Sequence, residues 1–224
     1  MKKLLLSGGG SAEQSRILDK IFISLIPKNK KILYIPIAWS SGVFDGCYNW
    51  FISTFSSFGT ERIEMWTDLN KKEYKDLENF GAMYIGGGNT FSLLNDLRKS
   101  EFIDLLKKFV ESGRVVYGGS AGAIIFGKDI RTAFYGSDSD KNMVNLLDFS
   151  GLNLVNDFSI QCHYEDNQDK DIFNFIKETK LIVIALHEDT GLSISNGRIK
   201  VIGYKSAYIF KDGKKIKVKV GSFL

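Results

Sequence analysis

The chain has 224 residues, 44% of them hydrophobic and 25% charged, a composition typical of folded globular proteins and not of disordered ones. The formal net charge of +4 comes from scattered lysines and does not indicate a nucleic-acid-binding patch. No apolar stretch reaches the roughly 18 residues of a membrane span, and the two cysteines, Cys47 and Cys162, lack the spacing of a disulfide framework or a zinc site.

The N-terminus reads MKKLLLSGGG, in which two lysines precede three leucines as in a signal peptide. The apolar run is too short for the hydrophobic segment of such a peptide and it stops at glycines. We therefore interpret residues 3–8 as a buried strand and expect a cytoplasmic protein, either a monomer or a homodimer. We expect no metal, cofactor, nucleic acid or membrane among its partners.

Short apolar runs alternate with helical patterns through the first half of the chain. Strands are predicted at 3–8, 31–38, 62–66, 82–88 and 114–119, and helices at 12–25, 47–59, 71–80, 90–100, 102–113 and 120–127. This alternation predicts βαβ units and a mostly parallel central sheet covered by helices on both faces. No linker or composition shift marks a boundary, so we predict an α/β fold in a single domain over residues 1–224.

The second half of the chain has a different pattern. Strand-like runs at 158–162 and 181–186 flank a predicted helix at 171–179. Two hairpins are then predicted, because Asn196-Gly197 and Asp212-Gly213 each stand between stretches of alternating apolar residues. Lysines interleaved with Ile and Val in the last hairpin indicate an exposed strand at the edge of a sheet.

Three glycine-rich runs, at 8–10, 86–88 and 118–122, follow predicted strands. Ligands of an open parallel sheet bind outside the carboxyl ends of its strands, so we expect the site there. The run GGSAG fits the pattern G-x-S-x-G between a strand and a helix, which is typical of a nucleophilic serine on a sharp turn. The alternative is a tightly packed corner in which Ser120 is only a helix cap.

The run GGGNT at 86–90 can turn backbone N–H groups toward such a serine, as an oxyanion hole requires. Phosphate binding is the competing interpretation, but the lysine of a Walker motif is missing and no GxGxxG follows the first strand.

A serine nucleophile needs a general base, and His163 and His187 are the two histidines in the chain. Each follows a strand-like run. The acid that orients the base is Glu188 or one of the aspartates between Ser120 and His163, namely Asp138, Asp140 and Asp148. Spacing alone does not choose among them.

Four features together resemble the aspartyl dipeptidase (peptidase E) and cyanophycinase family of serine peptidases. They are YIGGGNTF (84–91), GGSAGA (118–123), the pair His163-Tyr164 and ALHEDTGLSISNGRIKVIG (185–203). The resemblance implies a class I glutamine amidotransferase-like, flavodoxin-like three-layer α/β sandwich, with serine in place of the amidotransferase cysteine.

The resemblance also implies roles for individual residues. Ser120 matches the nucleophile, His163 the base, and the amides of Gly88 and Ala121 the oxyanion hole. The cyanophycinase branch resembles a Ser-His-Glu order, which makes Glu188 the acid.

The dipeptidase branch instead carries an aspartate shortly after an IRT run. In this chain Tyr135 occupies that place after IRT (130–132), which favours Glu188, with Asp138 as the weaker candidate.

The substrate pocket is expected to include Asn89, Arg131, Asp138 and Tyr164. Aspartyl dipeptidases resemble one another in carrying arginines after the catalytic histidine, whereas the run YEDNQDKD (164–171) is acidic. A basic or neutral substrate residue is therefore as plausible as an acidic one.

Three hypotheses follow for the function. The first is a serine peptidase that hydrolyses small peptides, as a dipeptidase does, through an acyl-enzyme. The second is an amidase or esterase acting on a non-peptide substrate with the same serine, and the third is a non-catalytic binding protein on the same scaffold.

Overall fold

The computed structural model describes residues 2–39, 41–58, 62–136 and 139–224. The strands in these ranges are β1 (Lys3–Ser7), β2 (Lys31–Ile35), β3 (Ile63–Met65), β4 (Phe80–Ile85), β5 (Val115–Gly119), β6 (Phe158–Gln161), β7 (Ile182–Ala185), β8 (Thr190–Ser195), β9 (Arg198–Gly203), β10 (Ala207–Lys211) and β11 (Lys214–Val218). The α-helices are α1 (Ala12–Ser24), α2 (Phe44–Ser56), α3 (Thr90–Lys99), α4 (Phe102–Glu111), α5 (Ala121–Ile124) and α6 (Asp169–Thr179). Short 3₁₀ turns are η1 (Ser41–Val43), η2 (Tyr74–Leu77), η3 (Arg131–Phe134) and η4 (Asp166–Gln168).

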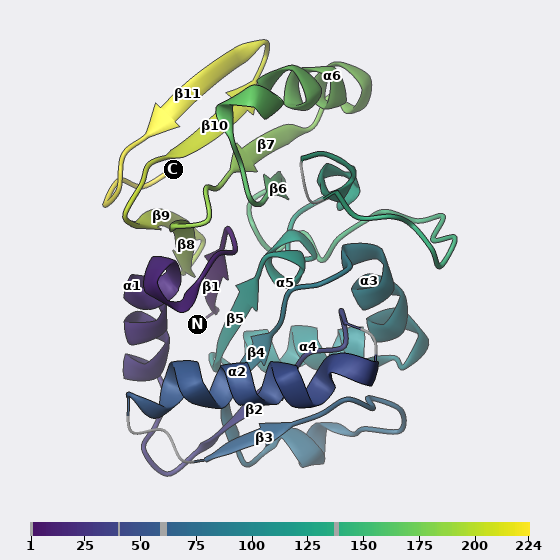
Figure 1. Ribbon diagram of the computed structural model, residues 1–224, viewed down its shortest axis with the longest axis vertical. Coiled ribbons are helices and arrows are strands. Elements are labelled where there is room, and N and C mark those ends of the chain that lie inside the picture. Colours follow the sequence, from purple (N-terminus) through teal and green to yellow (C-terminus); the bar gives the residue numbers. More distant parts are fainter. Residues whose placement is uncertain (1, 40, 59–61, 137–138) are drawn as a thin grey trace.

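The central sheet has the strand order β3-β2-β4-β5-β1-β8-β9. The first five strands of this order pair in parallel. Strand β8 pairs antiparallel with β1, and β9 pairs antiparallel with β8. Side chains alternate between the faces: Leu4 and Leu6 pack with α3, α4 and α5, whereas Leu5 packs with α1 and α2. Helices therefore cover both faces (Figure 1), and the predicted three-layer sandwich is confirmed.

A second, smaller sheet has the order β11-β10-β7-β6. Its strands β6 and β7 are parallel, and α6 packs against it through Ile172 and Phe175. Figure 1 shows this sheet and α6 at one end of the molecule, beyond β8 and β9. The sequence pattern predicts β6 and β7 as strands but does not say which strands they pair with.

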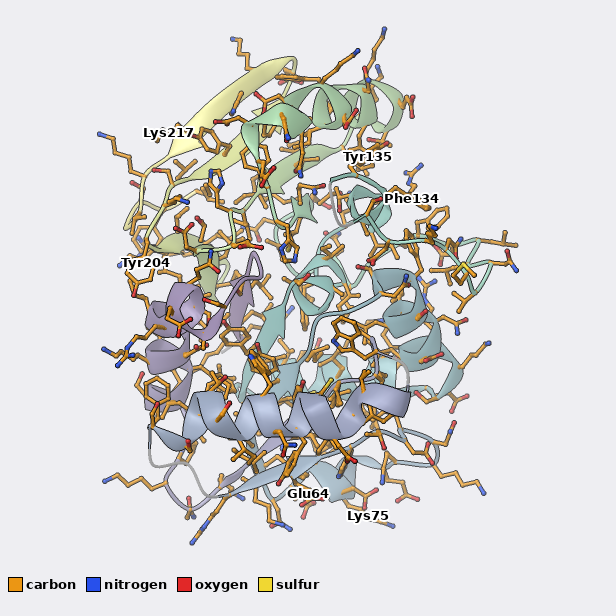
Figure 2. All side chains as sticks on the ribbon, viewed as in Figure 1. Glu64, Lys75, Phe134, Tyr135, Tyr204 and Lys217 are labelled. Atoms are coloured by element: carbon orange, nitrogen blue, oxygen red, sulfur yellow. The ribbon has the colours of Figure 1, made fainter. Side chains whose placement is uncertain are left out.

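The two predicted hairpins are confirmed, although they belong to different sheets. Strands β8 and β9 join the central sheet, and β10 and β11 form the edge of the smaller one. Both Asn196 and Gly197 have positive φ angles, 54° and 73°, as a two-residue type I′ turn requires. Lys217 is exposed on the edge strand β11 (Figure 2), as expected for a protected edge.

The predicted helix at 71–80 is wrong, since this segment forms only the 3₁₀ turn η2. Leu77 is buried within the turn, but the charged residues around it provide no second apolar row for a helix to bury, and Lys71 is left-handed with φ 56°. The predicted strand 31–38 ends at Ile35 because Pro36 follows, which has no N–H for the sheet.

In the described part of the chain, no helix is both long enough and apolar enough to cross a membrane.

Asp19 lies on α1, and its carboxylate is buried. Its exposed fraction is 1%, the Ser15 hydroxyl donates to its Oδ2 at 2.8 Å, and its Oδ1 has no hydrogen-bond partner among the described residues. Burial raises the pKa of Asp19 from 3.8 to about 6. The folded protein therefore holds this proton more tightly than the unfolded chain does.

Asp19→Asn is expected to raise the free energy of unfolding more at pH 8 than at pH 4. A raised carboxyl pKa contributes stability below pH 3.8, and this contribution is lost as the pH rises through about 6. The loss reaches about 3 kcal/mol, the free energy of a shift of about two pKa units. Urea unfolding of both proteins across this range checks it, with Asp45→Asn, exposed on α2, as control. An equal difference in free energy of unfolding between variant and parent at pH 4 and pH 8 would contradict a raised pKa for Asp19.

Candidate active site

Ser120 stands at the junction of β5 and α5, with φ 51° and ψ −115°. A non-glycine residue rarely adopts this conformation, and such strain is found where a nucleophile is held on a sharp turn. The small neighbours that the sequence shows have a packing reason. A Cβ added to Gly118 would lie 2.2 Å from the carbonyl oxygen of Gly122, and one added to Gly122 would lie 2.3 Å from that of Ile85.

Gly118→Ala is expected to lower the free energy of unfolding by roughly 3 kcal/mol, because the new methyl group would overlap backbone that cannot move aside as a side chain can. Thermal unfolding of the variant checks this expectation. Gly46→Ala is the matched control, since a Cβ there meets nothing within 4 Å. Equal melting temperatures for the two variants would show that the corner is not tightly packed.

His163 follows β6 and reaches the site from the smaller sheet. Its own φ is 49°, and its backbone N–H donates to the carbonyl of Gly8 at 2.9 Å. The side chain is 30% exposed, and Nε2 lies 2.8 Å from the Oγ of Ser120. A Cβ added to Gly9 would lie 2.2 Å from Cε1 of this ring, so the backbone of the first glycine run packs against the imidazole only because Gly9 has no side chain.

Glu188 lies in the loop between β7 and β8, with Oε1 3.0 Å from Nδ1 of His163. The other oxygen, Oε2, accepts a hydrogen bond from Nε2 of Gln14 at 3.0 Å. The hydrogen bond with His163 lowers the pKa of Glu188, and that from Gln14 adds to the effect. The carboxylate is therefore held ionised beside the imidazole, although 44% of its side chain is exposed.

The second histidine lies away from Ser120. The ring of His187 packs against Tyr164 and Tyr208, with ring centroids 5.0 Å and 5.9 Å apart. Of the two histidines, it is therefore His163 that the structure brings to Ser120.

The glycine turn after β4 lies against Ser120. A Cβ added to Gly87 would come within 3.2 Å of the Cβ of Ser120, and Gly88 has φ 130°. The Gly88 backbone N–H has no hydrogen-bond acceptor among the described residues, and the same holds for that of Ala121, the first residue of α5. Two free N–H donors beside a serine are what an oxyanion hole requires.

A cavity of about 800 Å³ opens beside Ser120, and we call it the main cavity. Gly88, Asn89 and His163 line it. Asn89 caps α3 by accepting from the N–H of Ser92, and its Nδ2 donates to the carbonyl of Lys141. Tyr135, labelled in Figure 2, follows η3 and also lines this cavity.

Two of the expected pocket residues do not line the main cavity. The guanidinium of Arg131 pairs with Asp129 at 2.7 Å, and it lies over the ring of Phe149. Tyr164 is 1% exposed and donates its hydroxyl to Asp166 and Asp169 within the smaller sheet region. Asp138 lies outside the described residues.

Trp39 and Gln14 were not singled out from the sequence, and Asp140 was considered only as a candidate for the acid that orients the base. Trp39 lines the main cavity and is 51% exposed. Asp140 lines it too, accepts from the N–H of Thr90 at 2.8 Å, and has its pKa raised by burial. Gln14 orients Glu188, and its signal was the capping box that Ser11 and Gln14 form at the start of α1.

In the described part of the chain, no three His, Cys, Asp or Glu side chains lie close enough together to bind a metal ion. Both cysteines are free thiols. Cys162 is buried next to the site, and this burial raises its thiol pKa.

The sequence matches peptidase family S51 over residues 4–202. It is 28% identical to peptidase E of Nostoc sp. over 195 residues, which cover 83% of this chain and 77% of the relative. It is also 28% identical to peptidase E of Shewanella denitrificans over 212 residues, covering 90% and 86%.

Among solved structures, the crystal structure of a peptidase from an acI-B1 Actinobacterium has the same fold. The TM-score is 0.77, with 18% identity over 100% of this chain and 96% of that one. The family match covers most of the chain, including the serine turn, His163 and Glu188. The chain therefore belongs to peptidase family S51 and is a serine peptidase.

Proposed function

We propose that this peptidase hydrolyses small peptides, as a dipeptidase does, through an acyl-enzyme on Ser120. One observation carries the proposal: Ser120 Oγ lies 2.8 Å from His163 Nε2, and His163 Nδ1 lies 3.0 Å from Glu188 Oε1. Nucleophile, base and orienting acid in hydrogen-bond contact form the arrangement that defines a catalytic triad.

In the first step, Ser120 Oγ attacks the scissile carbonyl carbon while His163 Nε2 takes the hydroxyl proton. The oxygen of the tetrahedral intermediate becomes negative and accepts hydrogen bonds from the amides of Gly88 and Ala121. Glu188 stabilises the imidazolium, which then gives its proton to the leaving amine as the C–N bond breaks. The acyl group remains on Ser120 as an ester.

In the second step, water attacks the ester carbonyl and His163 takes its proton. The C–O bond to Ser120 breaks, His163 returns the proton to Oγ, and the second product leaves as a carboxylic acid that loses its remaining proton to water. The main cavity supplies space for one small substrate, since about 800 Å³ falls within the range of small-ligand sites.

Hydrolysis of a dipeptide panel tests this proposal. We expect the protein to release free amino acids from unblocked dipeptides, and to do so faster than from the matching dipeptides with acetylated N-termini. A panel of p-nitrophenyl esters and primary amides is the control. Rapid cleavage of esters with no cleavage of any peptide would contradict a peptidase of this kind and favour the esterase hypothesis.

A further inference from the structure

A second cavity, of about 530 Å³, also borders Ser120, and we call it the aromatic cavity. It shares Trp39, Gly88, Ser120 and His163 with the main cavity, so the serine stands where the two meet. Besides glycines, Val43 and Cys47, the residues that distinguish it are aromatic or hydroxylated: Tyr34, Trp50, Tyr84, Tyr117, Ser7 and Ser15.

The floor of the aromatic cavity contains polar atoms that are not satisfied within the protein. The hydroxyl of Tyr117 is fully buried and faces the Asp19 carboxylate, and neither this hydroxyl nor Oδ1 of Asp19 makes a well-directed hydrogen bond among the described residues. Ser15 lies between this carboxylate and the cavity, because it lines the cavity and donates its hydroxyl proton to Asp19. The lone pairs of the Ser15 oxygen are therefore available to accept a hydrogen bond.

The charge at this floor is negative and uncompensated. Among the described residues, no Lys, Arg, Asp or Glu lines the aromatic cavity. The groups that face Asp19 are the hydroxyls of Ser15 on α1 and Tyr117 on β5. Burial raises the pKa of Tyr117 and of Tyr84, and the charge of Asp19 adds to both shifts. No ion pair of Asp19 with a Lys or Arg occurs in the described ranges.

We propose that the aromatic cavity receives the cationic side chain of a substrate residue, lysine or arginine, with its charge held by Ser15 and Tyr117 in front of Asp19. The inference rests on the proposed function, because it assigns a substrate class to that same site. The hydrocarbon stem packs against the aromatic rings, whose faces also attract a cation. The positive charge at the end of the side chain offsets the negative charge of the Asp19 carboxylate, which has no Lys or Arg partner among the described residues.

Other side chains fit this cavity less well. An acidic side chain would stand in front of Asp19 with no Lys or Arg among the described lining residues to offset the repulsion. An apolar side chain would pack against the rings but would offer no charge to the Asp19 carboxylate, whose single hydrogen bond from Ser15 leaves Oδ1 without one. A long side chain with a cationic end can pack its stem against the aromatic rings and place its charge near the Asp19 carboxylate.

Lysine and norleucine dipeptides provide the test, because the two side chains share the same stem length and differ in charge. We expect kcat/KM at pH 7.5 to favour lysine over norleucine by about tenfold or more at one of the two peptide positions. Asp19→Asn is expected to bring this ratio close to one. Asp140→Asn, which removes the carboxylate of the main cavity, is the matched control and should leave the ratio unchanged.

Three outcomes would overturn the inference: a norleucine peptide cleaved as well as the lysine one, a ratio that Asp19→Asn leaves intact, or a ratio that Asp140→Asn abolishes instead. Calorimetric binding to Ser120→Ala separates this failure from failure of the proposed function, since binding needs no hydrolysis. Tighter binding of the lysine peptide with no turnover by the parent would contradict only the hydrolytic mechanism. Turnover of peptides without a lysine preference would contradict only the cationic pocket.

Discussion

Ser120→Ala is expected to lower kcat/KM for dipeptide hydrolysis by at least about 10⁴-fold, the size of effect seen when a triad nucleophile is removed. The loss should lie in kcat, because Oγ forms the bond that defines the acyl-enzyme and contributes little to holding the ground-state substrate. Alanine adopts the φ of 51° no worse than serine does, so the fold should remain.

Steady-state kinetics with a lysine and a norleucine dipeptide would measure this effect, and circular dichroism would check the fold. Ser56→Ala, an exposed serine at the end of α2, is the matched control and should retain full activity. Retention of more than about a tenth of the parent activity by Ser120→Ala would remove Ser120 from the mechanism.

Glu188→Gln is expected to lower kcat/KM by about 10³-fold. A glutamine of the same shape can present its NH₂ group to Nδ1 of His163, which favours the wrong tautomer and does not stabilise the imidazolium. The effect should be smaller than the roughly 10⁴-fold known for a buried aspartate, because 44% of the Glu188 side chain is exposed and water screens its charge.

The control for this prediction is Glu165→Gln, an exposed carboxylate in the loop just after His163. It should change kcat/KM by less than twofold. If the two variants lost activity equally, the orienting acid would not be Glu188, and the acidic loop after His163 would have to supply it.

The serine turn and the glycine turn of the site could be predicted because their signals are local. A strand that ends in GGSAG, and another that ends in GGGNT, place small residues where the backbone must pack closely. The structure explains this spacing, since a Cβ on Gly118 would overlap the backbone of Gly122 and one on Gly122 would overlap that of Ile85. The hairpins were predictable for the same reason, because Asn196-Gly197 specifies its own turn.

Features that depend on distant partners could not be predicted in this way. Alternating apolar residues mark β6 and β7 as strands, but they do not say that these strands leave the central sheet to carry His163 and Glu188. Gln14 meets Glu188 across 174 positions of sequence. Arg131 was expected in the pocket from its place in the chain, yet the neighbouring Asp129 holds its guanidinium outside the cavity.

Reaction with a fluorophosphonate followed by peptide mass mapping would show whether Ser120 is a nucleophile activated by His163. We predict a single phosphonylated residue, Ser120, in the parent protein. His163→Ala should label at least about 100-fold more slowly although the serine is still present, since no base then takes its proton. A label on any other residue would show that Ser120 is not the nucleophile, and labelling of His163→Ala at the parent rate would show that His163 is not its base.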